Sequence, residues 1–333
     1  MTDQSTRGGR RATIIDVAAL AGVSRQTVSR AINDMPGISG ATRQRVLDAA
    51  EQLNYRPSRF GRGLVAAGPP TLGLLVDDLA NAYFPEIARA VVRAATARGW
   101  NVLVVETATG DAAEIGRDLV HRVDALVGYG LPDRAGHEVP DRMPLVRLDV
   151  PAEGDAAGVL YATAEGFAAL AAHLAATGTR TAAVLDSEHD GGGSVRARRL
   201  LEALDGSIAA SILPIGPEPT VAARAAQQVD TALALDPLPE VLIGWNDAHA
   251  LATLKALRVR GVDVPGRMRV VGIDGLALGT LLSPELTSIG VDIDLVAQHA
   301  VDLVDGMFEG RLPMSGEQVR RSVPYRLILR ETA

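Results

Sequence analysis

The chain has 333 residues, a formal net charge of −7 and no cysteine, which excludes disulfides and thiolate metal sites. Its length favours one small module plus a large α/β body. The first dozen residues lack the apolar core of a signal peptide, and no stretch approaches the roughly 18 consecutive apolar residues of a membrane span. We therefore expect a cytoplasmic protein with no membrane contact.

Charge is divided unequally along the chain. Residues 1 to 63 contain ten Arg against five Asp and Glu, a balance of +5, which leaves −12 for the remainder. A polyanion would therefore dock at the N-terminal end, because the acidic body would repel it.

Residues 13 to 33 predict two short helices joined at a glycine. Thr13 followed by Asp16 is typical of a capping box, and Gly22 supplies the tight turn. Ser24 caps the second helix, whose first turns leave polar side chains outward. These outward residues are Arg25, Gln26, Thr27, Ser29 and Arg30. The arrangement predicts a helix-turn-helix for the DNA major groove.

A third helix is predicted to begin after Ser39, with apolar residues at helical spacing from Val46 to Leu53. Its apolar face closes a three-helix core. The alternative is a small alanine-rich cap that never meets DNA. That alternative leaves Arg25 and Gln26 unexplained, because these side chain types read guanine and adenine edges through paired hydrogen bonds.

Several short segments of the first 57 residues together carry a more specific signal. They are Asp16-Val17-Ala18, Ala21-Gly22-Val23-Ser24, Thr27-Val28-Ser29-Arg30, Asn33, Ser39, Thr42-Arg43 and Leu53-Asn54-Tyr55. This run resembles the headpiece of the lactose-repressor family, also called the galactose-repressor family, of bacterial transcription regulators. The resemblance implies a DNA-binding headpiece over residues 12–57.

The same resemblance implies a set of DNA contacts. Arg25 and Gln26 are the first choices for bases, whereas Thr13 and Arg43 lie near helix starts and are expected at phosphates, with helix capping as the other role for such positions. The expected DNA-binding residues are Thr13, Ser24, Arg25, Gln26, Thr27, Ser29, Arg30, Asn33, Ser39, Thr42, Arg43, Tyr55 and Leu64.

Residues 58–70 connect the headpiece to the body. In the family this segment forms a hinge helix on the operator, with a leucine that matches Leu64 wedged into the minor groove. Gly61 and Gly63 lie inside it, and each costs a helix about 1 kcal/mol relative to Ala. We therefore expect a hinge that depends on DNA for its order. The alternative is a flexible linker without a specific role.

From residue 71 to 333, short β-branched or leucine-rich runs alternate with alanine-rich helical segments such as 86–98 and 248–260. This pattern predicts two doubly wound parallel-sheet subdomains with a cleft between them. The predicted strands are 72–76, 102–105, 125–127, 145–148, 182–185, 208–213, 241–243, 270–273 and 288–291.

The family resemblance extends to this body and implies a periplasmic-binding-protein-like fold. Its motifs are Gly73-Leu74-Leu75-Val76, Asn81-Ala82-Tyr83-Phe84, Gly244-Trp245-Asn246-Asp247, Val271-Gly272-Ile273-Asp274 and the crossover at 283–289. By this mapping the first subdomain takes about 71–176 and 293–320, and the second takes about 177–290 and 321–333.

A small-molecule effector is expected in the cleft. Asp274 and Arg199 are the most attractive residues, because opposed charged groups can hold a hydroxyl pair or a carboxylate. Aromatic residues are only 3% of the chain, which is low for a site that grips sugars by ring stacking. The resemblance implies these effector-binding residues, which match the family's cleft: Asp77, Asn81, Tyr83, Phe84, Arg199, Trp245, Asn246 and Asp274, although Asp77 could instead cap a helix.

Three departures from the family pattern leave the ligand open between a sugar and a related polar metabolite. No acidic or amide residue precedes Gly166, the segment 186–196 is acidic and glycine-rich, and residues 215–217 lack the usual aromatic. An operator-binding repressor with a vestigial pocket and no ligand control is therefore the alternative reading.

An enzyme is not expected. The six histidines show no metal-ligand spacing, no Gly-x-Ser-x-Gly motif occurs, and no cofactor or metal is implied. A secreted binding protein would share the body but would need a signal peptide and no headpiece. We instead expect a repressor that binds palindromic double-stranded operator DNA as a homodimer. The sequence stops after its last strand without a leucine heptad that could join two dimers.

Overall fold

The computed structural model describes residues 13–32, 35, 37–53, 69–108, 112–131, 139–186, 193–214, 216 and 218–333. Three of the expected DNA contacts, Asn33, Tyr55 and Leu64, lie outside these residues, as does most of the predicted hinge segment. Within the described ranges, each helix is too short or too polar to cross a membrane.

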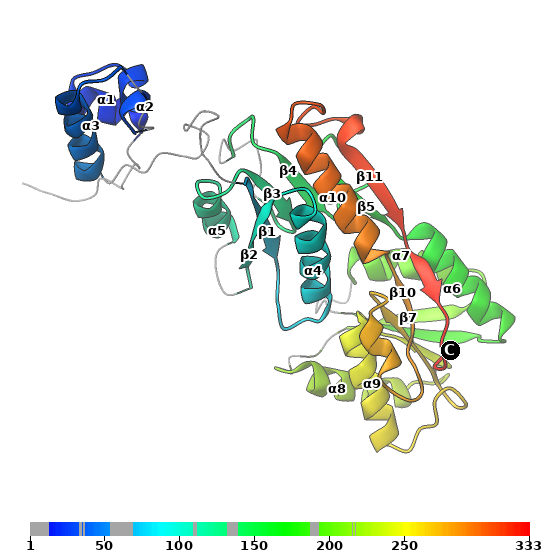
Figure 1. The fold of residues 1–333 in the computed structure, drawn as a ribbon. Helices are drawn as coiled ribbons and strands as arrows, with labels where there is room; N and C mark the ends of the chain where they lie inside the picture. The colour runs from blue at the N-terminus through cyan, green and yellow to red at the C-terminus, as the bar shows by residue number, and fades with distance from the viewer. Residues whose placement is uncertain are drawn as a thin grey trace, which may run out of the picture.

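The N-terminal module consists of three helices, α1 (Ile14–Ala21), α2 (Arg25–Ile32) and α3 (Gly40–Gln52) (Figure 1). Their shared core contains Val17, Val28 and Val46, all fully buried, together with buried alanines from each helix. The apolar spacing of the sequence therefore predicted most of this core. Leu20, which was expected on the same face as Val17 and Ala21, is instead 51% exposed.

Side-chain caps begin the three helices as the sequence predicted. The backbone N of Thr13 donates to Asp16 Oδ2 at 2.7 Å, and the backbone N of Asp16 donates to Thr13 Oγ1 at 3.4 Å, which completes the capping box. Ser24 Oγ and Ser39 Oγ accept from backbone N groups three residues later. Gly22 ends α1 with a left-handed φ of 64°.

The first sheet of the body is parallel throughout, in the order β11-β5-β4-β3-β1-β2. Its strands are β1 (Thr71–Val76), β2 (Asn101–Glu106), β3 (Ala125–Gly128), β4 (Leu145–Leu148), β5 (Gly158–Ala162) and β11 (Arg320–Pro324). Helices α4 (Tyr83–Thr96) and α10 (Ile293–Phe308) lie side by side on one face (Figure 1). On the other face Leu75 packs with Leu119 at the end of α5 (Ala112–Leu119).

The second sheet has the order β12-β10-β9-β8-β6-β7 and is parallel except for β12, which runs antiparallel to β10. Its strands are β6 (Thr181–Leu185), β7 (Ala209–Leu213), β8 (Val241–Ile243), β9 (Arg269–Ile273), β10 (Thr287–Gly290) and β12 (Arg326–Ile328). The helices that pack on it are α6 (Ala164–Ala176), α7 (Val195–Leu204), α8 (Val221–Leu233) and α9 (Asp247–Val259). A 3-10 turn, η3 (Ala277–Thr280), precedes β10, and η4 (Glu317–Val319) precedes β11.

All nine predicted strands are present within a residue or two, but the expected subdomain boundaries need two corrections. Helix α6, expected in the first subdomain, packs against α7, β10 and β12 of the second. Residues 320–324 form β11 at the edge of the first sheet, so the final passage to the second sheet comes four residues later than expected. The apolar residues of α6 predict that one face of the helix is buried. They do not predict which of the two sheets that face packs against.

The chain passes between the two sheets three times, after β5, after β10 and between β11 and β12. The first and third passages are joined, because the backbone N of Tyr325 donates to the carbonyl of Ala162 at 2.8 Å. Gly166 lies directly against this junction. A Cβ added there would lie 2.6 Å from the Cβ of Tyr325 and 2.9 Å from the side chain of Ile289.

We expect Gly166→Val to lower the free energy of unfolding by about 1–3 kcal/mol, since the added side chain overpacks the junction. Chemical denaturation of the full chain measures this change. The matched control is Ala172→Val, because Ala172 is exposed on the same helix. Equal stability of the two variants would show that α6 can move away from Tyr325 without cost.

Candidate functional site

A cavity of about 220 Å³ lies where the two sheets meet. Its residues follow the carboxyl ends of strands from both sheets, among them β1, β3, β4, β8 and β9, which is where parallel α/β sheets bind ligands. The lining residues are Asp77, Asn81, Tyr83, Phe84, Tyr129, Asp149, Tyr161, Arg196, Trp245, Asn246, Asp274, Val291 and Tyr325. We call this cavity the inner pocket.

Asp274 is the most unusual group of the inner pocket. Its residue is only 9% exposed, and its Oδ2 atom is buried without a hydrogen-bond partner. Burial raises the pKa of this carboxyl to about 8, although Arg196 opposes the shift. A buried polar atom without a partner costs about 1–3 kcal/mol, so a ligand that hydrogen-bonds to Oδ2 gains that energy.

A buried carboxylate holds the backbone around Asp274 in place. The carboxylate of Asp247 accepts from the backbone N of Leu276 at 2.6 Å and from the hydroxyl of Ser288. Ser288 in turn accepts from the backbone N of Gly275 at 3.1 Å. Asp247 is fully buried, so it serves this loop from inside the protein rather than from the pocket.

Asp149 and Asp274 each have a strained backbone conformation. They have φ values of 57° and 130°, and among the described residues they are the non-glycine positions with positive φ. Asp149 follows β4 of the first sheet and Asp274 follows β9 of the second, so each subdomain contributes one of them. Strain of this kind costs about 1–3 kcal/mol and gathers at functional sites.

Arg196, and not Arg199, supplies the cation of the inner pocket. Its Nη1 donates to the carbonyl of Trp245 at 3.2 Å, and its guanidinium carbon lies 4.7 Å from the centre of the indole ring. Burial opposes the charge of Arg196, but Tyr325, Asp274 and Asp149 favour it, and the net effect is a raised pKa. The predicted Arg199 lies one turn further along α7 and is exposed.

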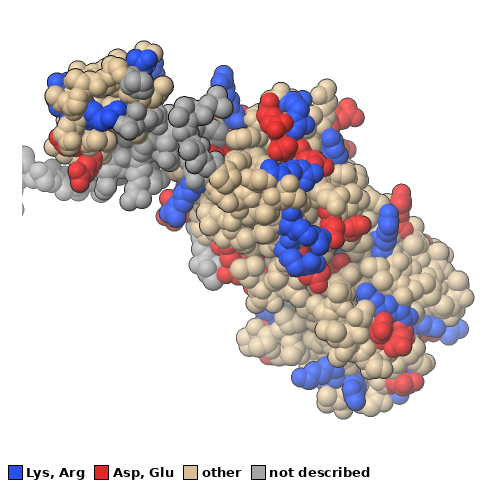
Figure 2. Space-filling model, in the orientation of Figure 1, with Lys and Arg blue, Asp and Glu red and all other residues tan. Residues whose placement is uncertain are grey.

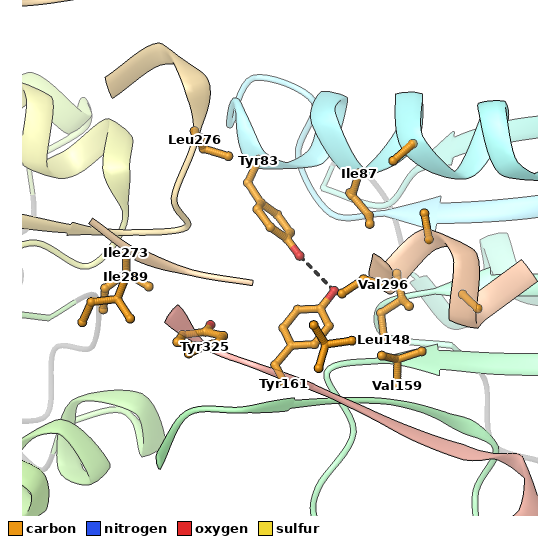
Figure 3. Close-up of a cluster of buried hydrophobic side chains, with 14 of the residues drawn as sticks. Tyr83, Ile87, Leu148, Val159, Tyr161, Ile273, Leu276, Ile289, Val296 and Tyr325 are labelled. Atoms are coloured by element: carbon orange, nitrogen blue, oxygen red, sulfur yellow. Dashed lines mark hydrogen bonds between the residues drawn. The ribbon is translucent and has the colours of Figure 1, made fainter. Parts of the chain in front are cut away.

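Three tyrosine hydroxyls form a closed triangle of hydrogen bonds on the first-subdomain side. Tyr83 donates to Tyr161 at 2.9 Å (Figure 3). Both hydroxyls lie 2.7 Å from that of Tyr129. Burial raises the pKa of all three above the usual value for tyrosine, so they stay neutral. When each hydroxyl donates once within the triangle, only its acceptor capacity remains for a ligand.

The inner pocket is richer in aromatic residues than the composition of the whole chain suggested. The chain has four Phe, two Trp and five Tyr, and six of these side chains line the inner pocket. A low average therefore conceals a local concentration. Tyr325 adds to it from the third passage between the sheets, where its ring also packs edge-on against Phe167 at 5.9 Å.

Seven of the eight residues expected at the effector site line the inner pocket, with Arg199 as the exception. Asn81 and Asn246 also have local roles, since their side-chain oxygens accept from the backbone N of Tyr83 and of His249. Sequence reasoning missed Tyr129, Asp149, Tyr161, Arg196, Val291 and Tyr325. Their position at strand ends was the available signal for Tyr129 and Asp149, since each follows a predicted strand.

The expected DNA-reading residues lie on the outer side of α2. Arg25, Gln26 and Arg30 are exposed, and Thr27 and Ser29 are half-buried. Figure 2 shows basic atoms at several places on the headpiece and acidic atoms on its lower side, and the visible face of the body also carries both signs. Arg43 is half-buried, and its Nη2 donates to the carbonyl of Met35 at 3.4 Å. The capping roles of Thr13, Ser24 and Ser39 are present as described above.

Comparison with known proteins agrees with both parts of the molecule. Residues 13–58 match the family described as bacterial regulatory proteins, lacI family, and residues 171–333 match a periplasmic binding protein-like domain. A LacI family transcriptional regulator from Arthrobacter sp. FB24 is 30% identical with a TM-score of 0.72, covering 80% of this chain and 99% of that one. The chain belongs to the LacI family.

Other LacI-family proteins match over most of their length. The HTH-type transcriptional repressor PurR of Vibrio parahaemolyticus is 29% identical over 308 residues, which cover 88% of this chain and 91% of PurR. The Lac repressor dimer, solved with operator and the anti-inducer ONPF, has a TM-score of 0.66 at 26% identity over 97% of this chain and 99% of that chain. The chain is thus a DNA-binding transcription regulator rather than an enzyme, and the predicted fold class is confirmed.

Asp274 should give this LacI-family body a distinctive pH dependence. Between the unfolded pKa of about 3.9 and the folded value of about 8, the folded state holds a proton that the unfolded chain releases. The contribution of Asp274 to the free energy of unfolding therefore falls as the pH rises from about 4 to about 8. Because Asn cannot release a proton, Asp274→Asn should raise the melting temperature more at about pH 8 than at about pH 5.

Thermal melts of the full chain at both pH values measure this difference. Asp77→Asn is the matched control, because it makes the same chemical change at an exposed residue of the same pocket. A change in melting temperature for Asp274→Asn that is the same at both pH values would contradict the assignment.

Proposed function

We propose that this chain is a ligand-responsive transcriptional repressor that acts in the cytoplasm. It binds a palindromic operator as a homodimer, and a small molecule in the inner pocket changes its affinity for DNA. The named relatives support this proposal, since PurR is called a repressor and the Lac repressor dimer was solved on its operator. A second structure of the Arthrobacter regulator is a complex with lactose, at a TM-score of 0.70.

The unpartnered carboxyl oxygen of Asp274 is the observation that carries ligand control. A pocket without a ligand function would have no need of a buried acceptor, a strained backbone and an arginine stacked on Trp245. This combination argues against the vestigial-pocket alternative. It also marks the position where a ligand hydrogen-bond donor is expected.

The chemistry of the inner pocket favours a neutral polyhydroxyl ligand. Three carboxyl groups, two amide oxygens and the tyrosine triangle offer oxygen atoms to a ligand, whereas Arg196 is the one cationic side chain among its lining residues. Aromatic walls suit the apolar faces of a sugar ring. The volume of about 220 Å³ lies below the range of about 300–1,000 Å³ for drug-sized ligands, so one sugar ring is the expected occupant.

Coupling to DNA follows from the position of the inner pocket. Tyr161, Val291 and Tyr325 lie at the three passages between the sheets, and all three line the cavity. A bound ligand therefore contacts the segments about which the subdomains turn. A coupling free energy of about 1–3 kcal/mol between ligand and operator would be sufficient for regulation.

An exposed apolar surface on the second subdomain fits a second copy of the chain. A groove of about 770 Å³ runs between α9 and the segment after η3, with Leu251, Leu254, Leu281 and Leu282 among its residues. Leu281 is 79% exposed and the neighbouring Val259 on α9 is 76% exposed. Apolar patches of this kind mark association surfaces, and a palindromic operator requires two headpieces.

Leu281→Glu should therefore convert the dimer to a monomer and weaken operator binding, because a charge would be buried at the interface. Sedimentation velocity and a DNA-binding titration measure the two effects. Leu235→Glu is the control, since Leu235 is exposed and lies on a different groove. A dimer that survives Leu281→Glu would place the interface elsewhere.

The headpiece assignments predict two different kinds of loss. Arg25→Ala should change the preferred base at one position of each half-site, at a cost of about 1–3 kcal/mol for the preferred sequence. Arg43→Ala should weaken binding to all operator variants alike, because a phosphate contact carries no sequence information. Titrations against a library of single-base operator variants measure both. A uniform loss for Arg25→Ala would refute its base contact.

Selection of genomic DNA fragments by the purified full-length chain tests the function as a whole. The selection is run without ligand and with sugars, nucleosides and small carboxylates in turn. The proposal expects one palindrome whose enrichment changes with a sugar. A palindrome that is indifferent to every compound would support the vestigial-pocket alternative, and the absence of any palindrome would overturn the DNA-binding proposal.

A further inference from the structure

Most of the positive charge at the N-terminal end lies outside the three-helix headpiece. Residues 13–57 contain five Arg against four Asp and Glu, so their formal net charge is only +1. Residues 1–12 contain three Arg against one Asp, a balance of +2, and residues 58–63 add two Arg without an acidic residue. A headpiece with a net charge near zero attracts the DNA polyanion only weakly.

The described part of the headpiece has few cations to spare for phosphates. On α2, Arg25 and Arg30 are exposed, and the base contacts are expected from this helix. On α3, Asp48 and Glu51 are exposed and contribute negative charge. Because phosphate contacts supply most of the affinity for DNA, further cations are needed beside these helices.

The first turn of α1 offers little to a phosphate. The backbone N and the Oγ1 atom of Thr13 both donate to Asp16 Oδ2 at 2.7 Å. The carboxylate of Asp16 therefore lies at the positive end of the helix dipole, where a phosphate would otherwise be attracted. Attraction of the DNA backbone to this end of the headpiece falls to residues that precede Thr13.

Three arginines lie shortly before Thr13, in the order Arg7-Gly8-Gly9-Arg10-Arg11-Ala12. They lie outside the part of the chain that the structure describes. An extended chain spans at most about 3.3–3.6 Å per residue, so Arg11 lies within about 7 Å of Thr13 and Arg7 within about 22 Å. The minor groove of B-DNA is about 6 Å wide. The arginines can therefore reach from the start of α1 into a neighbouring groove.

The residue types in this segment suit a narrow groove. Gly8 and Gly9 have no side chain, which allows the backbone to approach another molecule closely. Arginine is favoured in the narrow minor groove of A·T-rich DNA, where the negative potential is enhanced. A guanidinium also enters such a groove at lower cost than an ammonium, because it is more weakly hydrated.

We propose that Arg7, Arg10 and Arg11 form an arm that enters the DNA minor groove beside the major groove expected for α2. Each bound headpiece then gains more positive charge from this arm than from its three helices. The arm adds salt-sensitive affinity and favours A·T-rich flanking sequence. This inference rests on the DNA-binding activity of the family, and it is independent of the effector and of the dimer surface.

Fluorescence-anisotropy titrations of the full-length chain test the proposal with two duplexes of equal length, one of alternating A·T and one of alternating G·C base pairs. The unaltered chain should bind the A·T duplex several-fold more tightly. Arg10→Ala/Arg11→Ala should remove this preference. It should also lower the slope of log affinity against log salt by about 2 for each bound headpiece, since each phosphate charge neutralised contributes about 0.9.

Arg142→Ala/Arg267→Ala is the matched control, because it removes the same charge from exposed positions of the body. It should leave the slope and the A·T preference unchanged. Arg10→Lys/Arg11→Lys should keep the slope, because the charge remains, but should reduce the A·T preference, because the ammonium is more strongly hydrated.

An unchanged salt slope for Arg10→Ala/Arg11→Ala, or an A·T preference that survives in this variant, would overturn the arm. Tighter DNA binding by the same variant would also overturn it, and would show that these arginines instead bind the acidic body. Failure of the unaltered chain to bind either duplex would contradict DNA binding itself, which separates that result from a failure of the arm.

Discussion

The triple passage of the chain between two sheets is the constraint on which the rest of the molecule depends. Each subdomain is built from segments that are not continuous in sequence, because β11 returns to the first sheet and β12 then ends in the second. The passages lie together, as the hydrogen bond between Tyr325 and Ala162 shows. Strand ends from both sheets therefore converge on one small volume. The inner pocket is the space that remains between these strand ends. Some residues that line it therefore also lie at the hinge between the two subdomains.

Electrostatics in this volume follow from its burial. Asp274 and Arg196 interact electrostatically inside the protein, where such interactions are stronger than at the surface. The loop that holds Asp274 is fixed from behind by Asp247 and Ser288. Such a rigid support keeps a carboxylate in a strained conformation without a ligand present. The polar groups of the inner pocket are therefore already in place before a ligand binds. This lowers the entropy cost of ordering them on binding.

Much of this organisation could be predicted from the sequence, because periodicity is a local property. The three headpiece helices and nine strands followed from apolar spacing, and the family resemblance located seven residues of the inner pocket. The family resemblance implied Arg199 for the effector site, whereas Arg196, one turn earlier on α7, is the residue that lines the inner pocket. Residues three apart lie on the same side of a helix, so the exact start of α7 decides which of them reaches the cleft. The place of α6 and the gathering of tyrosines depend on tertiary contacts that no local pattern encodes.

Trp245 and Trp100 differ in a way that makes the chain its own optical reporter. Trp100 is buried between α4 and α10, where its Nε1 donates to Asp305 and its ring meets Phe308 at 4.8 Å. Trp245, the other tryptophan of the chain, lines the inner pocket with a guanidinium against its ring. A ligand in the cleft changes the surroundings of one indole and leaves the other untouched. Intrinsic fluorescence therefore separates occupancy of the cleft from general unfolding without any added dye.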